Sequence, residues 1–143
     1  MPGSDDSPTL SSELRTGVMR LSRRLRQERA ADELSEPQTS VLLHLFREGP
    51  LTPATLSVWA QVSPPSMNRT LNVLEEAALV ERTRSHDDRR MVHVSLTDAG
   101  RTIALETRRR REVWLDHRLD TLDAHERAVL GEAATIIRKL FEQ

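Results

Sequence analysis

The 143-residue sequence contains no cysteine, which excludes disulfide bonds, thiolate catalysis, cysteine zinc sites and thiol-based redox sensing. Aromatic residues make up only 3%, so the core must consist mainly of leucine, valine, alanine and isoleucine, as in packed helices. No apolar run approaches the roughly 20 residues that a membrane-spanning helix needs, and no membrane partner is expected. The polar, acidic segment 1–7 does not resemble a signal peptide. We therefore expect a cytoplasmic protein.

Enzyme signatures are missing as well. The chain has no GxGxxG, GxxxxGK or GxSxG motif, and paired carboxylates such as Glu75-Glu76 fall on exposed helix surface. The histidines form no HxxxH or HExxH pair, so neither a metal site nor a cofactor is expected. The sequence predicts no catalytic residues and a protein that is not an enzyme.

The charge of the chain is balanced overall but uneven locally. The formal net charge of −1 argues at first against nucleic acid as a partner. Contact with DNA depends on local charge, however, and four arginines outnumber two aspartates within residues 82–90. Charged residues make up 30% of the chain and are spread along it, which is typical of exposed helix faces.

Apolar periodicity and capping residues predict helices in the first half of the chain. A stripe of five apolar residues predicts a helix over about 10–29: Leu10, Leu14, Val18, Leu21 and Leu25. The Ser35–Gln38 capping box begins a second helix, which Gly49 ends. Thr52 and Pro53 begin a third helix, in which Leu56 and Trp59 are expected to point inward.

Residues 63–96 hold the most informative pattern. Ser63 caps a fourth helix with Pro64 at its first position, and the apolar residues Met67, Leu71, Leu74 and Ala78 fall on one side. The opposite side carries Pro65, Ser66, Arg69 and Asn72. Alternating residues then predict strands at about 80–84 and 91–96 around a charged loop. A polar-faced helix followed by a basic hairpin is a winged helix-turn-helix layout, which suits a major-groove helix with a hairpin on the neighbouring backbone or minor groove.

The hairpin loop and the C-terminal helices complete this layout. Asp88 and Arg90 are two residues apart, so the carboxylate can hold the arginine extended toward a narrow minor groove. Thr97 caps a helix expected over 98–119, and Asp123 with Glu126 begins a last helix with its own apolar stripe. The arginine run 108–111 points to all sides of its helix and is expected to be solvated or paired. The predicted fold class is mostly α with a small β-hairpin.

The chain resembles the multiple-antibiotic-resistance regulator (MarR) family from about residue 10 to its end. The resemblance is carried by Val62–Arg69, Leu74-Glu75, Leu79-Val80, Asp88-Arg89-Arg90 and the run Val94–Gly100. It implies a winged helix-turn-helix protein with N- and C-terminal dimerisation helices. The corresponding domains are a disordered tail at 1–9, a dimerisation region at 10–34 and 98–143, and a DNA-binding domain at 35–97.

The same resemblance implies a homodimer on double-stranded, pseudo-palindromic promoter DNA, released by a small aromatic or anionic ligand. It places four residues in the major groove: Ser66, Asn68, Arg69 and Asn72. Arg90 becomes the arginine of the wing tip and Asp88 its anchor. Together with the pattern of charges, the expected DNA-binding residues are Ser63, Pro65, Ser66, Asn68, Arg69, Asn72, Arg84, Asp88, Arg89 and Arg90. Arg20 and His44 are candidate ligand-binding residues, although each also fits an ordinary surface or packing role.

The predicted function is a dimeric transcription regulator, most simply a repressor under the control of a small molecule. One alternative is a constitutive DNA-binding regulator without an effector, which would have no polar pocket between its dimer and DNA-binding regions. Another is a winged-helix module that binds protein, which would do so with little dependence on salt.

Overall fold

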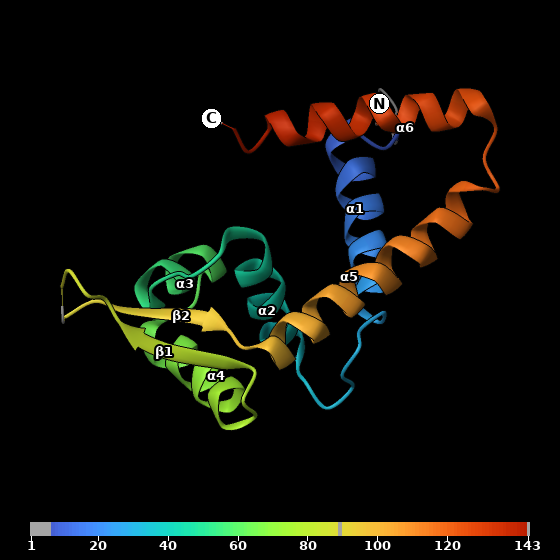
Figure 1. The fold of residues 1–143 in the computed structure, drawn as a ribbon. Coiled ribbons are helices and arrows are strands. Elements are labelled where there is room, and N and C mark those ends of the chain that lie inside the picture. The colour runs from blue at the N-terminus through green and yellow to red at the C-terminus, as the bar shows by residue number, and fades with distance from the viewer. Residues whose placement is uncertain (1–6, 89, 143) are drawn as a thin grey trace.

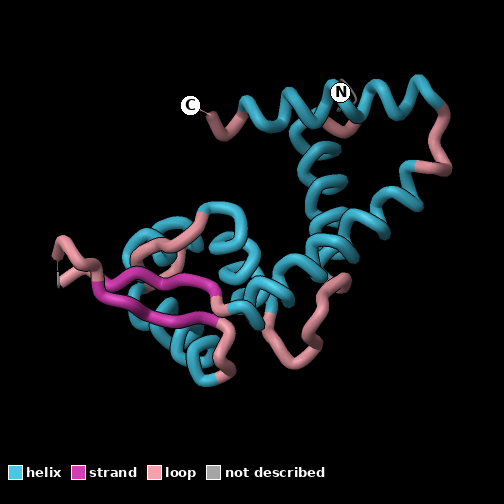
Figure 2. Tube along the Cα trace, in the orientation of Figure 1, coloured by secondary structure: helices cyan, strands magenta, loops and turns pink. Residues whose placement is uncertain are grey.

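The computed structural model describes residues 7–88 and 90–142, in which six helices and a two-stranded antiparallel sheet are found. A compact unit of three helices and the hairpin lies at one end, and the other three helices extend away from it (Figure 1). Figure 2 shows how little of the chain is strand. The predicted fold class is therefore confirmed. The elements are α1 (Leu10–Arg26), α2 (Glu36–Glu48), α3 (Pro53–Ala60), α4 (Pro64–Glu76), β1 (Val80–Arg84), β2 (Val92–Leu96), α5 (Asp98–Leu119) and α6 (Ala124–Lys139).

The core of the compact unit consists of apolar side chains from α2, α3, α4 and the hairpin. Burial is complete or nearly so at Leu42, Leu56, Leu71, Leu74 and Val94. Antiparallel pairing runs from Val80 opposite Leu96 to Arg84 opposite Val92, so β2 turns Val94 toward the core. The sequence pattern located these residues because the helical stripes and the strand alternation all point to the same core.

Capping residues fix where the helices begin. Ser35 and Gln38 form both hydrogen bonds of the predicted capping box, and Asp123 and Glu126 form the second one. The side chain of Ser63 accepts a hydrogen bond from the backbone N–H of Ser66 at 3.2 Å. These bonds satisfy backbone donors that the first turn of a helix leaves free, which is why the helix starts were predicted correctly.

A tight joint connects the turn after α4 to the start of α5. The Thr97 hydroxyl donates to the carbonyl oxygen of Ala78 at 2.6 Å, and the Thr97 backbone N–H donates to that of Leu79 at 3.1 Å. Gly100 lies in the first turn of α5, where a Cβ atom would overlap the Leu79 carbonyl group. Glycine is required there by this close approach of two backbones. Ala78 adopts a left-handed conformation with φ of 58°.

The helices α1, α5 and α6 form the extended part of the molecule, in which α6 lies far from the compact unit (Figure 1). Neither α1 nor α6 has a buried residue. The apolar stripe of α6 is open to solvent in the single chain, with Leu130 46% and Leu140 58% exposed. The stripe of α1 is similarly open, with Leu14 39% and Val18 45% exposed. A single chain thus leaves these faces uncovered.

Four details differ from the sequence-based expectations. Ala78, expected on the apolar side of the fourth helix, lies beyond the end of α4 and is exposed. The first helix ends at Arg26 rather than at residue 29, and Thr9 caps it instead of belonging to a tail. The second strand begins at Val92. Trp59 does not point into the core but remains 38% exposed, with its ring stacked on that of His44 at a centroid distance of 3.8 Å. The inward side of α3 is formed instead by Leu56 and Ser57, which are buried, and by Ala60, which packs against the core. Residues 1–6 of the expected disordered tail lie outside the described residues.

Candidate nucleic-acid interface

The outer face of α4 is polar and accessible. Asn68, Arg69 and Asn72 are exposed, while Met67, Leu71 and Leu74 hold the opposite face in the core. Arg69 carries a positive charge that can bind a phosphate or a guanine, and asparagine can bind base edges. Ser63 and Pro65 are exposed at the N-terminus of the helix. Ser66 is only half-buried and faces a cavity behind α4, so it lies partly away from the outer face.

Arg82 ties the hairpin to this helix. Its Nη2 donates to the Asn72 side-chain oxygen at 3.1 Å, and its Nη1 lies 3.2 Å from a carboxylate oxygen of Glu75. The Arg82 side chain is only 22% exposed. The sequence-based expectation counted Arg82 as part of the basic charge of the hairpin, whereas the structure pairs that charge with Glu75. The signal was available in the sequence as an arginine at an inward-facing strand position, but its partners depend on tertiary packing.

The loop between β1 and β2, residues 85–91, is closed by backbone hydrogen bonds. The Ser85 N–H donates to the carbonyl oxygen of Met91 at 2.9 Å, and the Met91 N–H donates to that of Asp88 at 3.0 Å. The carboxylate of Asp88 accepts from the backbone N–H of Arg90 at 2.9 Å. The expected contact between Asp88 and Arg90 did not name an atom of Arg90, and in the structure it is the backbone N–H. The aspartate therefore shapes the turn from which Arg90 projects.

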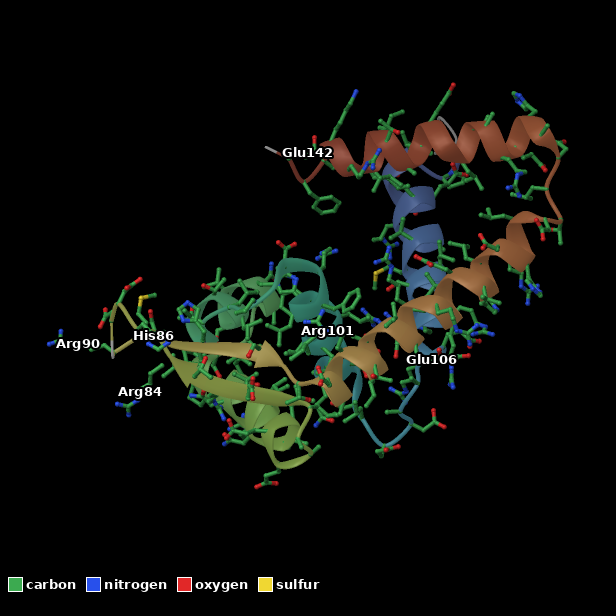
Figure 3. All side chains as sticks on the ribbon, in the orientation of Figure 1. Arg84, His86, Arg90, Arg101, Glu106 and Glu142 are labelled. Atoms are coloured by element: carbon green, nitrogen blue, oxygen red, sulfur yellow. The ribbon has the colours of Figure 1, made fainter. Side chains whose placement is uncertain are left out.

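Two further basic groups lie on the hairpin. Arg84 and Arg90 are exposed and extend outward from the end of the hairpin that is farthest from α5 (Figure 3). The expected DNA-binding residue Arg89 lies outside the described residues. The structure thus presents exposed arginines at two places, Arg69 on α4 and Arg84 and Arg90 on the hairpin. The contacts of Arg82 with α4 hold the two elements together.

A cavity of about 400 Å³ lies directly behind α4. Its wall includes Met67 and Thr70 of α4, Glu36 of α2 and Arg26 of α1. A second cavity, of about 430 Å³, shares Arg26 and Glu36 with the first and adds Arg111 of α5. Arg26 lies 3.7 Å from one Glu36 oxygen, and Arg111 lies 3.9 Å from the other. Both distances are long, and the facing atoms of Glu36 and Arg111 are buried without a hydrogen bond.

Comparisons with known proteins identify the family and the general function of the chain. The MarR family model matches residues 34–92. An HTH-type transcriptional regulator of Mycobacterium bovis is 37% identical over 139 residues, which cover 97% of each chain. The chain belongs to the MarR family. It is a DNA-binding helix-turn-helix transcriptional regulator and not an enzyme.

Solved structures share the fold of this chain. FabT of Streptococcus pneumoniae, solved in complex with DNA, is 26% identical, with a TM-score of 0.74 over 91% of this chain and 94% of FabT. A MarR family protein from Bacillus stearothermophilus shares the fold, with a TM-score of 0.83, 23% identity and 94% coverage of each chain.

None of the helices within residues 7–88 and 90–142 combines the length and the apolar character that a membrane span requires.

The two candidate ligand-binding residues of this MarR-family chain are not brought together. His44 lines a small pocket beside Trp59 to which Arg20 does not contribute, and Arg20 is exposed on α1. Burial lowers the pKa of His44 below its ordinary value, and the neighbouring Arg47 lowers it further. A neutral ring can accept from the Arg47 guanidinium, whose Nη2 lies 3.3 Å from Nδ1. His44 is thus engaged with Arg47 and Trp59, and the expected Arg20–His44 pair does not form within one chain.

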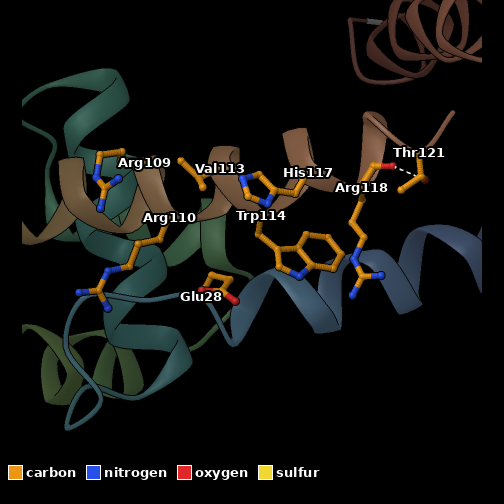
Figure 4. A pocket seen from close by; sticks show the side chains of 8 residues that line it. All are labelled: Glu28, Arg109, Arg110, Val113, Trp114, His117, Arg118 and Thr121. Carbon is orange, nitrogen blue, oxygen red and sulfur yellow. Dashed lines mark hydrogen bonds between the residues drawn. The ribbon is translucent and has the colours of Figure 1, made fainter. Parts of the chain in front are cut away.

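The arginine run of α5 is paired, as expected. Arg108 pairs with Glu112 at 3.1 Å, while Arg109 and Arg110 both pair with Glu106. These hydrogen bonds hold the pKa of Glu106 at about 2. Near them lies a cleft of about 530 Å³ (Figure 4), where the Arg118 guanidinium lies 5.3 Å from the centre of the Trp114 ring. This cleft is lined by α5, by Thr121 just after it and by Glu28 of the segment after α1; among the described residues, none of α2–α4 or the hairpin contributes.

Proposed function

We propose that the chain is a cytoplasmic homodimeric repressor that binds pseudo-palindromic promoter DNA. One observation carries the proposal: the exposed polar face of α4, with Arg69 at its middle, is joined through Arg82 to a hairpin that projects Arg84 and Arg90. Held together in this way, α4 could enter the major groove while the arginines at the tip of the hairpin reach the adjacent minor groove. The similarity to FabT, which was solved with DNA, supports it. Residues 35–97 would bind DNA.

A dimer is supported by the uncovered apolar faces of α1 and α6. Apolar side chains exposed to water do not contribute to the stability of a single chain. Large exposed ones recur along both helices: Leu14, Val18, Leu21, Val129, Leu130, Ile136 and Leu140. Contiguous apolar surface of this kind marks an interface. We propose that residues 10–34 and 98–143 of two copies cover one another over roughly 2,000 Å² or more.

The proposal is tested by selecting DNA fragments that bind the purified protein. The selected sequences should contain an inverted repeat whose half-sites are about one helical turn, roughly 34–36 Å, apart, because two copies present two recognition helices. Affinity for the selected operator should fall at least tenfold between about 50 and 200 mM salt, because phosphate contacts release counterions. A single, non-repeated site would contradict the dimer, and a flat salt response would favour a protein-binding module.

We further propose that a small aromatic or anionic ligand releases the protein from DNA by binding in the cavity behind α4. The cavity touches α1 through Arg26 and the recognition helix through Met67 and Thr70, so its occupant would contact both regions. A carboxylate there could take the place of Glu36 beside Arg26. Only a ligand whose affinity differs between two arrangements of the helices can shift the protein off DNA.

This part of the proposal is checked by a thermal-shift screen of aromatic acids. Hits on the wild type should disappear in Arg26→Ala, because the cation of the cavity is lost, and should persist in Arg20→Ala. Arg20 is the matched control, since it lies on the same helix but outside the cavity lining. Hits that respond to Arg20 instead would move the site out of this cavity, to the exposed surface of α1 around Arg20. The absence of any hit would favour a constitutive regulator.

A further inference from the structure

The side chain of Asn72 has a defined orientation on the outer face of α4. The atom of Asn72 that faces the Arg82 guanidinium must be the oxygen, because arginine has five N–H donors and no acceptor. The observed contact, from Arg82 Nη2 to Asn72 Oδ1 at 3.1 Å, satisfies this requirement. The amide nitrogen of Asn72, with two N–H donors, is then the end that points away from Arg82.

The pairing with Glu75 keeps Arg82 in this role. A carboxylate oxygen of Glu75 lies 3.2 Å from Arg82 Nη1, so the two ends of the guanidinium are bound to two residues one turn apart on α4. The Arg82 side chain is mostly covered and its charge is compensated. Arg82 is therefore poorly suited to bind a phosphate itself, whereas it is well placed to hold Asn72 still.

This orientation changes which base Asn72 can recognise. A free asparagine prefers adenine, because its oxygen accepts from adenine N6 while its nitrogen donates to N7. Although an amide oxygen has two lone pairs, this oxygen is directed at Arg82, so the two N–H donors are the groups that Asn72 turns away from Arg82 and presents to DNA. Guanine presents two acceptors in the major groove, O6 and N7, and matches two donors better than adenine, whose N6 amino group would face another donor.

We propose that Arg82 is a positioning residue for base specificity. By binding the Asn72 oxygen, it directs the N–H donors of Asn72 toward the DNA, so that Asn72 selects guanine over adenine at one base pair of each half-site. The inference rests on the proposed function, in which α4 enters the major groove. It gives Arg82 a role in specificity although Arg82 itself contacts no base. It also states which base Asn72 prefers, guanine rather than adenine.

The experiment measures the binding of wild type and variants to operators in which each base pair is replaced in turn. For the wild type, guanine should be preferred over adenine by roughly 5- to 100-fold at one position per half-site, the discrimination expected of a paired contact. Asn72→Ala should erase the preference at that position. Arg82→Met should raise adenine to equal or above guanine at the same position while leaving the preferences elsewhere unchanged.

Arg84→Met is the matched control, since Arg84 is an exposed arginine on the same strand. It should lower affinity for all operators alike and leave the base preferences intact. Asn72→Asp provides a test that keeps Arg82 in place. The aspartate can still accept from Arg82 but presents only acceptors to DNA, so preference at that position should move toward bases with an amino donor, cytosine or adenine.

The outcomes separate the inference from the proposed function. If the wild type binds no DNA sequence preferentially, both fail. If it binds an operator but reads adenine at the Asn72 position, the inference alone is overturned. The same conclusion follows if Arg82→Met, shown to be folded by its thermal transition, weakens binding equally for every base, because Arg82 would then only brace the hairpin. If Arg82→Met does not fold, the wild-type preference decides: guanine at the position that Asn72→Ala erases supports the inference, and adenine overturns it.

Discussion

Replacing Gly100 by alanine is expected to lower the free energy of unfolding by at least about 2 kcal/mol, the range for forcing an atom into a filled site. The added Cβ would overlap the Leu79 carbonyl group, which is backbone and cannot move aside as a flexible side chain could. Relief would require α5 to shift away from the turn after α4. Such a shift would stretch the hydrogen bonds from Thr97 to the carbonyl oxygens of Ala78 and Leu79.

Urea denaturation at one fixed protein concentration measures this effect, since a dimer makes stability depend on concentration. Gly131→Ala is the control, because a Cβ there meets nothing within 4 Å. Gly131 lies in the interior of α6, on the side opposite the apolar stripe, so alanine should stabilise the protein by about 0.5–1 kcal/mol. Equal effects of the two substitutions would show that the close approach at Gly100 has no energetic consequence.

The second large effect is expected at the wing. Arg90→Ala should weaken operator binding by roughly 1–3 kcal/mol, because it removes a charged contact from the tip. Asp88→Ala should also weaken binding, even though it removes a negative charge near DNA, because the carboxylate holds the backbone N–H of Arg90. Simple electrostatics predicts the opposite sign for Asp88→Ala.

Asp88→Asn separates the two explanations, and fluorescence anisotropy with labelled operator measures all three variants. The asparagine oxygen can still accept from the Arg90 backbone, so the turn should persist and affinity should equal or exceed that of the wild type. Tighter binding by Asp88→Ala would mean that the wing is only a diffuse positive patch. A loss in Asp88→Asn as large as that in Asp88→Ala would show that the charge itself matters.

Local chemistry explains why much of the fold could be predicted. The starts of α2, α4 and α6 depend on a capping side chain and residues within three positions of it, as Ser35 and Asp123 illustrate. The buried residues Leu71, Leu74 and Val94 follow from the periods of a helix and a strand. These signals are written in short stretches of sequence and need no knowledge of what packs against them.

Contacts between distant elements could not be predicted in the same way. The partner of Asn72 is Arg82, ten residues away on β1, and it depends on how the hairpin lies against α4. The isolated bridge between Leu51 and Val94 gave no signal in the sequence. Trp59 was expected to point inward from the third helix, yet its ring stacks on that of His44 and remains partly exposed. The spacing of Asp88 and Arg90 suggested a contact between them, but spacing alone does not show that the atom held is the backbone N–H.

The joint at Thr97 and Gly100 makes α5 a rigid lever for the recognition helix. The 22 residues of α5 span about 33 Å at 1.5 Å per residue. A pivot of about 10° near the far end would carry the joint, and α4 with it, through about 6 Å over this length. That displacement is a sizeable fraction of the roughly 34–36 Å between successive half-sites, so two such levers would no longer fit both at once. A change in the angle between two copies would therefore be enough to release the operator, and the internal structure of each compact DNA-binding unit would not have to change.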